Sequence, residues 1–156
     1  IEHLNLIHDS GVQFIWQTGK YYYQKISDSM KGKELPNLKV MDFISDMGAA
    51  YKAADLIISR AGASSISEFQ IIGKPVILIP SPNVAEDHQT KNAMALVNKQ
   101  AAIYVKDAEA PDTLLPLALK VIADDSKLKS LSENVKKMGL KNSADIIADE
   151  VLKLIK

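Results

Sequence analysis

Residues 59–68, SRAGASSISE, bring small side chains and one carboxylate together where an apolar run gives way to a helical pattern. Gly62, Ala63, Ser64 and Ser65 would let a ligand approach the backbone at the start of a helix. Free N–H groups and the positive end of the helix dipole attract phosphate at such a position. The stretch can therefore hold a pyrophosphate without any lysine.

Glu68 has two interpretations. It follows Ser65 by three residues, and S-x-x-E is the capping box that satisfies a helix's own amides. Alternatively, the Glu68 carboxylate accepts hydrogen bonds from a vicinal diol such as a ribose. Arg60, the only arginine, either steadies the phosphate-binding turn or pairs with a carboxylate such as Asp46 or Asp55. We expect the pairing.

A second candidate turn follows the apolar run LKVMDF. Phe43, Ile44 and Met47 place apolar surface where a polar strand end is expected, so a flat apolar ligand could rest there. The alternative is that Phe43 and Met47 belong to the core.

The third candidate turn is PSPNVAEDHQTKN, residues 80–92. Its acceptors and amides suit the hydroxyl groups of a sugar, which need donors and acceptors held in place. Acidic residues there could instead only complement a helix dipole. We do not expect His88 to be a general base, because neither a nucleophile nor a second carboxylate is arranged around it in sequence. The polar residues of this turn are Glu86, Asp87, His88, Gln89 and Asn92.

Composition excludes several classes of protein. Nineteen basic and nineteen acidic residues give no net charge, so the overall charge does not predict electrostatic binding to nucleic acid or anionic lipid. There is no cysteine, and His3, His8 and His88 are not at metal-ligand spacing, so we expect neither a metal nor another cofactor. No apolar run reaches the roughly 18 residues that span a bilayer.

Short, continuously apolar runs, as expected of strands that are buried on both faces of a parallel sheet, alternate with helical patterns that would be the crossover helices. We therefore predict one doubly wound α/β domain with a helical C-terminus, whose ligands bind beyond the carboxyl ends of the strands. Ile1, Leu4 and Ile7 already have helical spacing, and Asp112 and Ser143 are expected caps with Gly139 as a helix stop. The expected strands are 12–16, 38–43, 55–59, 75–79 and 101–105, and the expected helices 19–31, 46–53, 64–72, 87–98, 110–123, 126–138 and 143–154.

The block from DFISDMGAAYKAADLIISRAGASS to DHQTKNA resembles the C-terminal, donor-binding domain of MurG-type glycosyltransferases, which add N-acetylglucosamine (GlcNAc) to lipid I in peptidoglycan synthesis. The resemblance runs from about QTGK to the strand AAIYV. It implies a GT-B architecture, of which this chain is most of one Rossmann-like half, and an inverting transfer that needs no cofactor.

The resemblance also implies roles for the three turns. Phe43, Ile44 and Met47 match the uracil site, with Ile44 acting through its backbone. Ala63, Ser64 and Ser65 match the diphosphate turn, and Glu68 matches the carboxylate that binds the ribose. His88 and Gln89 match positions that contact GlcNAc, although the first is commonly glutamine in the family. No residue of this chain matches a catalytic base.

Two features of the family are not found in residues 1–156: a glycine-rich GGSxGA loop with the strand before it, and the acceptor domain. We therefore expect a UDP-GlcNAc-binding fragment that is inactive alone. Lipid I and the cytoplasmic face of the bacterial inner membrane would be reached, peripherally, through the absent domain. Two alternatives remain: a free-standing subunit of a two-component lipid-linked GlcNAc transferase, and a non-catalytic nucleotide-binding α/β module.

Overall fold

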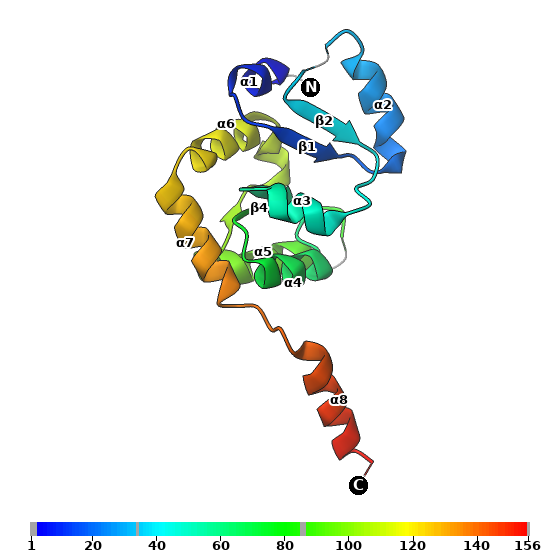
Figure 1. Ribbon diagram of the computed structural model, residues 1–156, viewed down its shortest axis with the longest axis vertical. Coiled ribbons are helices and arrows are strands. Elements are labelled where there is room, and N and C mark those ends of the chain that lie inside the picture. The colour runs from blue at the N-terminus through cyan, green and yellow to red at the C-terminus, as the bar shows by residue number, and fades with distance from the viewer. Residues whose placement is uncertain (1–2, 34, 85–86, 156) are drawn as a thin grey trace.

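The computed structural model describes residues 3–33, 35–84 and 87–155, so Ile1 and Glu86, named above, lie outside the described residues. Strands and helices alternate along the chain up to a helical C-terminal third (Figure 1). The elements are α1 (Leu4–Asp9), β1 (Phe14–Gln17), α2 (Lys20–Met30), β2 (Leu38–Met41), α3 (Met47–Ala53), β3 (Ile57–Ser59), α4 (Ala63–Ile72), β4 (Val76–Leu78), α5 (His88–Val97), β5 (Ile103–Tyr104), η2 (Asp107–Glu109), α6 (Ala110–Ile122), α7 (Asp125–Lys136) and α8 (Ser143–Lys153).

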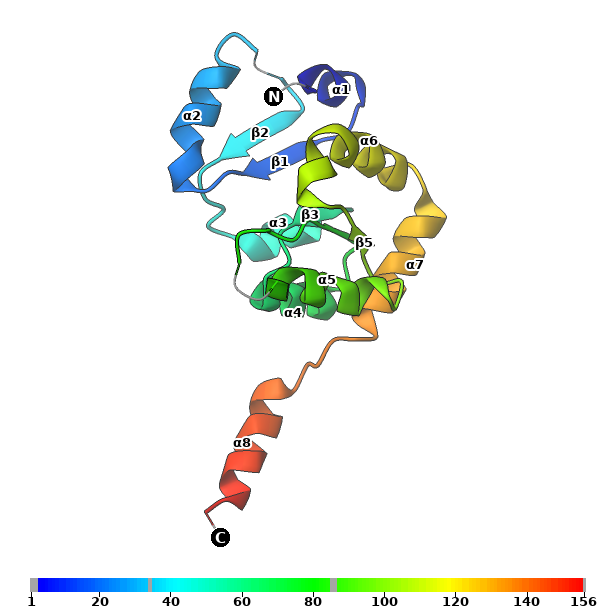
Figure 2. The same ribbon diagram turned by 180° about the vertical axis from the view of Figure 1, so that it is seen from behind.

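All strand pairs in the described chain are parallel, which confirms the predicted α/β class. The hydrogen bonds form two ladders, β1 with β2 and the three strands β3-β4-β5. The parallel strands therefore form two hydrogen-bonded groups, and no ladder joins β1 to β3 in the part of the chain that the structure describes. Figure 2 shows the two ladders with α3 beside them and α6 near β1.

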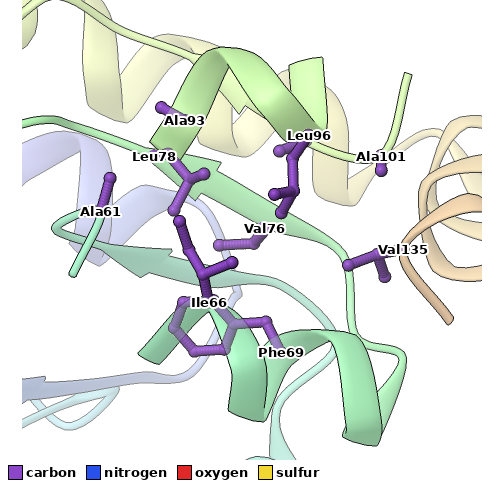
Figure 3. Close-up of a cluster of buried hydrophobic side chains, with 10 residues drawn as sticks. Ala61, Ile66, Phe69, Val76, Leu78, Ala93, Leu96, Ala101 and Val135 are labelled. Atoms are coloured by element: carbon purple, nitrogen blue, oxygen red, sulfur yellow. The ribbon is translucent and has the colours of Figure 1, made fainter. Parts of the chain in front are cut away.

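Strand β4 is the centre of the fold, because its two faces belong to different apolar clusters. Val76 and Leu78 lie in a cluster with residues of α4 and α5. Ile77 and Ile79 lie in a second cluster with α6. Side chains alternate across a strand, so β4 is buried on both faces by helices on opposite sides of the sheet. Figure 3 shows the first cluster, in which Val76 and Leu78 lie between α4 and α5.

Strand β1 is far less buried than β4. Ile15 is 54% exposed and Trp16 is 37% exposed, although neighbouring residues of a strand point to opposite faces. The expectation that every strand is buried on both faces is therefore wrong for β1. The physical reason is that helices cover both faces of β4, whereas the extensive contacts of β1 within the described residues are with β2 alone.

The C-terminal helices start slightly earlier than their expected caps. Glu109 occupies the N-cap of α6, so Asp112 lies in the first turn instead, and Asn142, not Ser143, is the N-cap of α8. Gly139 lies just beyond α7, as expected of a stop. A Cβ atom at Gly139 would lie 2.6 Å from the backbone oxygen of Gln70, so only glycine fits there without a shift.

Helix α8 extends away from the rest of the molecule in both views (Figures 1 and 2). Its residues are all exposed, including Ile147 at 63% and Leu152 at 61%. The helical prediction for 143–154 is confirmed, but the helix is not packed on the α/β body.

Candidate functional site

The turn after β3 begins helix α4 at Ala63. Gly62 is the N-cap and makes no side-chain cap hydrogen bond, and Ser65 is already the third helical residue. The capping-box interpretation of Ser65 and Glu68 is therefore wrong. The first bond of this helix runs from the Ile66 N–H to the Gly62 carbonyl at 3.0 Å. The amides of Ala63, Ser64 and Ser65 precede it and have no intrahelical acceptor, so they can donate to an anion.

The Glu68 side chain is held by a tyrosine. The Tyr51 hydroxyl donates a hydrogen bond of 2.7 Å to Glu68 Oε2. Ser64 and Glu68 are both exposed and stand four residues apart, which places them on one face of α4. Burial, and then the hydrogen bond and negative charge of Glu68, raise the pKa of Tyr51 to about 12. Tyr51 is therefore a protonated donor throughout the neutral range.

The turn after β2 exposes an aromatic ring. Phe43 is 60% exposed, so the alternative that it belongs to the core is wrong. Met47 is the first residue of α3 and is half-buried. The Ile44 N–H donates to Gln17 Oε1 at 2.8 Å, which ties this turn to the end of β1. Asp46 caps α3 by accepting from the Ala49 N–H at 2.8 Å.

The turn before α5 is bonded to the phosphate-binding turn. Gln89 Oε1 accepts from the N–H of Ala61 at 3.2 Å and from the N–H of Ser81 at 2.9 Å. Asn92 Nδ2 donates to the Ala61 carbonyl at 3.2 Å. Residue His88 is exposed at the first position of the helix, beside Gln89. Residues 88–92 thus fix the backbone on both sides of Ala61.

Arg60 joins the carboxyl ends of three strands. Its guanidinium donates to the carbonyls of Ile79 at 3.2 Å and Pro80 at 3.4 Å, and it forms an ion pair with Asp107. Pairing with a carboxylate was expected, but the expected partners were wrong. Asp46 caps α3, whereas Asp107 follows β5 and meets Arg60 because β3, β4 and β5 end at one edge.

The described residues form neither a metal site nor a membrane-spanning helix. No group of three or more histidine, cysteine, aspartate or glutamate side chains is arranged to hold a metal ion within ranges 3–33, 35–84 and 87–155. None of the helices in these ranges has the length and apolar character needed to cross a membrane.

Sequence reasoning missed Tyr51 and Gln17. Tyr51 is four residues after Met47, so one turn of α3 places both on the same helix face, and that spacing was the available signal. Gln17 gave no comparable signal, because its contact with Ile44 joins residues 27 positions apart.

Parallel strands, helices on both faces of β4 and mutually bonded turns at the carboxyl ends define a doubly wound α/β domain. The chain belongs to glycosyltransferase family 28, because residues 2–147 match the model described as the glycosyltransferase family 28 C-terminal domain.

Curated relatives and a solved structure agree with this family. A protein of Bacteroides thetaiotaomicron is 65% identical over 94% of this chain and 40% of its own length. A protein of Bacteroides fragilis is 67% identical over 92% of this chain and 38% of its own length. Both are named UDP-N-acetylglucosamine--N-acetylmuramyl-(pentapeptide) pyrophosphoryl-undecaprenol N-acetylglucosamine transferase. The chain thus spans 40% of the length of the first of these curated relatives and 38% of the length of the second.

The crystal structure of MurG from Acinetobacter baumannii has the same fold. It superposes with a TM-score of 0.81 at 25% sequence identity, over 97% of this chain and 44% of that one. The resemblance to MurG-type enzymes and the predicted fold are therefore both confirmed.

Proposed function

We propose that this chain is the donor-binding domain of an inverting hexosyltransferase that moves GlcNAc from UDP-GlcNAc to lipid I, forming lipid II. The observation that carries the proposal is the identity of 65% over 94% of the chain to a relative named as that transferase. The proposal extends from the family to a specific donor and acceptor, and it assigns the donor to the carboxyl-end turns.

The base and ribose would occupy the turns after β2 and β3. Uracil packs against the exposed Phe43 ring and Met47 and hydrogen-bonds the Ile44 backbone, in exchange for the bond that Gln17 now accepts. The ribose hydroxyls donate to the carboxylate of Glu68, which the Tyr51 hydrogen bond already orients.

The diphosphate and the sugar would lie along the starts of α4 and α5. Amides of Ala63, Ser64 and Ser65 receive the diphosphate. His88 and the Nε2 amide of Gln89 face the GlcNAc hydroxyls, while Gln89 Oε1 stays on the backbone of the phosphate-binding turn. One side chain thereby connects sugar binding to phosphate binding.

In the proposed reaction, an acceptor hydroxyl oxygen forms a bond to the anomeric carbon while the bond from that carbon to the diphosphate oxygen breaks. Negative charge develops on the departing UDP. The amides at the start of α4 point at that charge and need no reorganisation, so they lower the barrier electrostatically. The proton of the acceptor hydroxyl passes to a general base in the remainder of the enzyme, and we assign no catalytic base to this chain. Lipid I and peripheral contact with the cytoplasmic face of the inner membrane are assigned to the remainder of the enzyme.

Amide NMR titration of the purified chain with UDP-GlcNAc, UDP and ADP tests the proposal. Both uridine ligands should shift the amides of residues 43–47 and 62–68, and only UDP-GlcNAc should strongly shift those of His88 and Gln89. ADP should bind more weakly and leave residues 43–47 largely unshifted. Equal responses to ADP and UDP would contradict a uridine site and favour a general nucleotide-binding module.

A further inference from the structure

We propose that Tyr51 is a positioning residue that holds the Glu68 carboxylate in its ribose-binding orientation. The inference rests on the proposed donor site and adds a residue that the turns themselves do not contain. Its basis is the hydrogen bond of 2.7 Å from the Tyr51 hydroxyl to Glu68 Oε2, which joins α3 to α4.

The position of the phenol is set by the core. The Tyr51 ring packs edge-on against Phe69, with ring centroids 6.0 Å apart and planes at 87°. Phe69 is 1% exposed and belongs to the apolar cluster around β4, against which Tyr51 also packs. Well-packed rings have few alternative rotamers, so the Tyr51 hydroxyl is a fixed point from which to hold an exposed side chain.

The chemistry of the pair suits a diol. A carboxylate only accepts hydrogen bonds, and the phenol uses Oε2, so Oε1 remains to accept from ribose hydroxyls. An exposed glutamate otherwise samples several rotamers, and ordering it on binding costs affinity. Since the pKa of Tyr51 is raised to about 12, the phenol keeps its proton and remains a donor throughout the neutral range.

Tyr51 also connects the base turn to the ribose carboxylate. Helix α3 starts at Met47 in the base turn, where Asp46 caps it, and Tyr51 lies one turn further along. Helix α3 would therefore fix the residues that contact the uracil relative to the carboxylate that binds the ribose, because the helix is capped at its start and Tyr51 is packed on the core.

The test compares UDP with 2′,3′-dideoxy-UDP, which keeps the base and diphosphate but lacks both ribose hydroxyls. Calorimetry on the purified chain should show that Tyr51→Phe weakens UDP binding by about fivefold, the effect of one hydrogen bond, and changes dideoxy-UDP binding by less than about twofold. Glu68→Asp keeps the charge but shortens the side chain, and it should likewise reduce the preference for UDP over dideoxy-UDP. The double variant Tyr51→Phe with Glu68→Gln should bind UDP about as weakly as Glu68→Gln alone.

Tyr104→Phe is the matched control, because Tyr104 is also a partly buried tyrosine packed on the cluster around β4. It should leave both affinities unchanged. If the wild-type chain binds UDP no better than the dideoxy analogue, the ribose site and the proposed function fail together. Suppose instead that the wild type prefers UDP over dideoxy-UDP. If Tyr51→Phe keeps the same preference, or if it weakens the binding of both ligands equally, the positioning role is overturned and the donor site stands.

Discussion

The Gln89 side chain accepts a hydrogen bond from the backbone of Ala61, 28 residues earlier in the chain, at 3.2 Å. The same oxygen accepts from Ser81 at 2.9 Å. Gln89 therefore holds together two turns at the carboxyl ends of β3 and β4. Only its Nε2 group is left to face a sugar, so its proposed ligand role and its structural role use different atoms.

Replacing Gln89 with methionine keeps the length of the side chain and removes both roles. We expect UDP binding to weaken by about 1 kcal/mol, because the phosphate-binding turn loses its tie. UDP-GlcNAc binding should weaken by about 2–3 kcal/mol, because sugar hydroxyls are also left unpaired. Calorimetry with both ligands measures the difference, and Gln70→Met on α4 is the control. Equal losses for the two ligands would refute the sugar contact.

Replacing Glu68 with glutamine should weaken UDP binding by about 1–2 kcal/mol, since a charge-assisted hydrogen bond to the ribose becomes a neutral one. The melting temperature should change little, because Glu68 caps no helix. Glu133→Gln, a change at another exposed glutamate, should alter neither quantity. An unchanged affinity with a lowered melting temperature would mean that Glu68 is only structural.

Phe43 and Phe69 provide a matched pair of aromatic residues. Phe43 is 60% exposed and Phe69 is 1% exposed. Phe43→Ala should weaken UDP binding by about 1 kcal/mol, through loss of apolar contact with the base, and leave stability nearly unchanged. Phe69→Ala should lower the free energy of unfolding by about 3–5 kcal/mol. Urea unfolding and calorimetry on the two variants check this, and a large stability loss in Phe43→Ala would contradict the exposed placement.

Arg60 should be a brace that lysine cannot replace. A single guanidinium nitrogen, Nη1, reaches Asp107 and two backbone carbonyls together, whereas the ammonium group of lysine ends a shorter, flexible side chain and is more strongly hydrated. We expect Arg60→Lys to lower the free energy of unfolding by about 1–2 kcal/mol. In a double-mutant cycle by urea unfolding, Asp107→Asn should cost less in the Arg60→Lys background. Strict additivity of the two changes would show that the pair is not coupled.

Stability at high pH should depend on Tyr51. Its pKa is about 12 in the folded protein, against about 10 in an unfolded chain. As pH rises from about 10 to about 12, the unfolded state releases this proton first, so unfolding becomes easier. The difference in stability between wild type and Tyr51→Phe should therefore be constant below pH 10 and decrease toward pH 12. Urea unfolding at several pH values measures it, and a difference that grows with pH would contradict the assignment.

The elements could be predicted because local signals and tertiary packing agree. The run PVILI predicts a strand buried on both faces, and Val76–Leu78 is one. The helix at 110–123 is found at Ala110–Ile122. Asp112 failed as a cap because the preceding 3₁₀ turn Asp107–Glu109 already leads into the helix.

The contacts within the candidate site could not be predicted in the same way. Arg60 and Asp107 are 47 positions apart, and their meeting depends on the order of β3, β4 and β5. The S-x-x-E spacing misled because Gly62 starts α4 before Ser65, and a spacing motif does not fix where a helix begins. The role of Gln89 depends on which backbone amides the fold leaves nearby.

The close approach of Gly139 to Gln70 sets where the chain leaves the α/β body. A Cβ atom at Gly139 would lie 2.6 Å from the backbone oxygen of Gln70, so any other residue there would force the segment after α7 away from α4. That segment leads into α8, which begins at Ser143 and has 11 residues, a length of about 16 Å. The place from which this exposed helix starts therefore depends on a residue without a side chain.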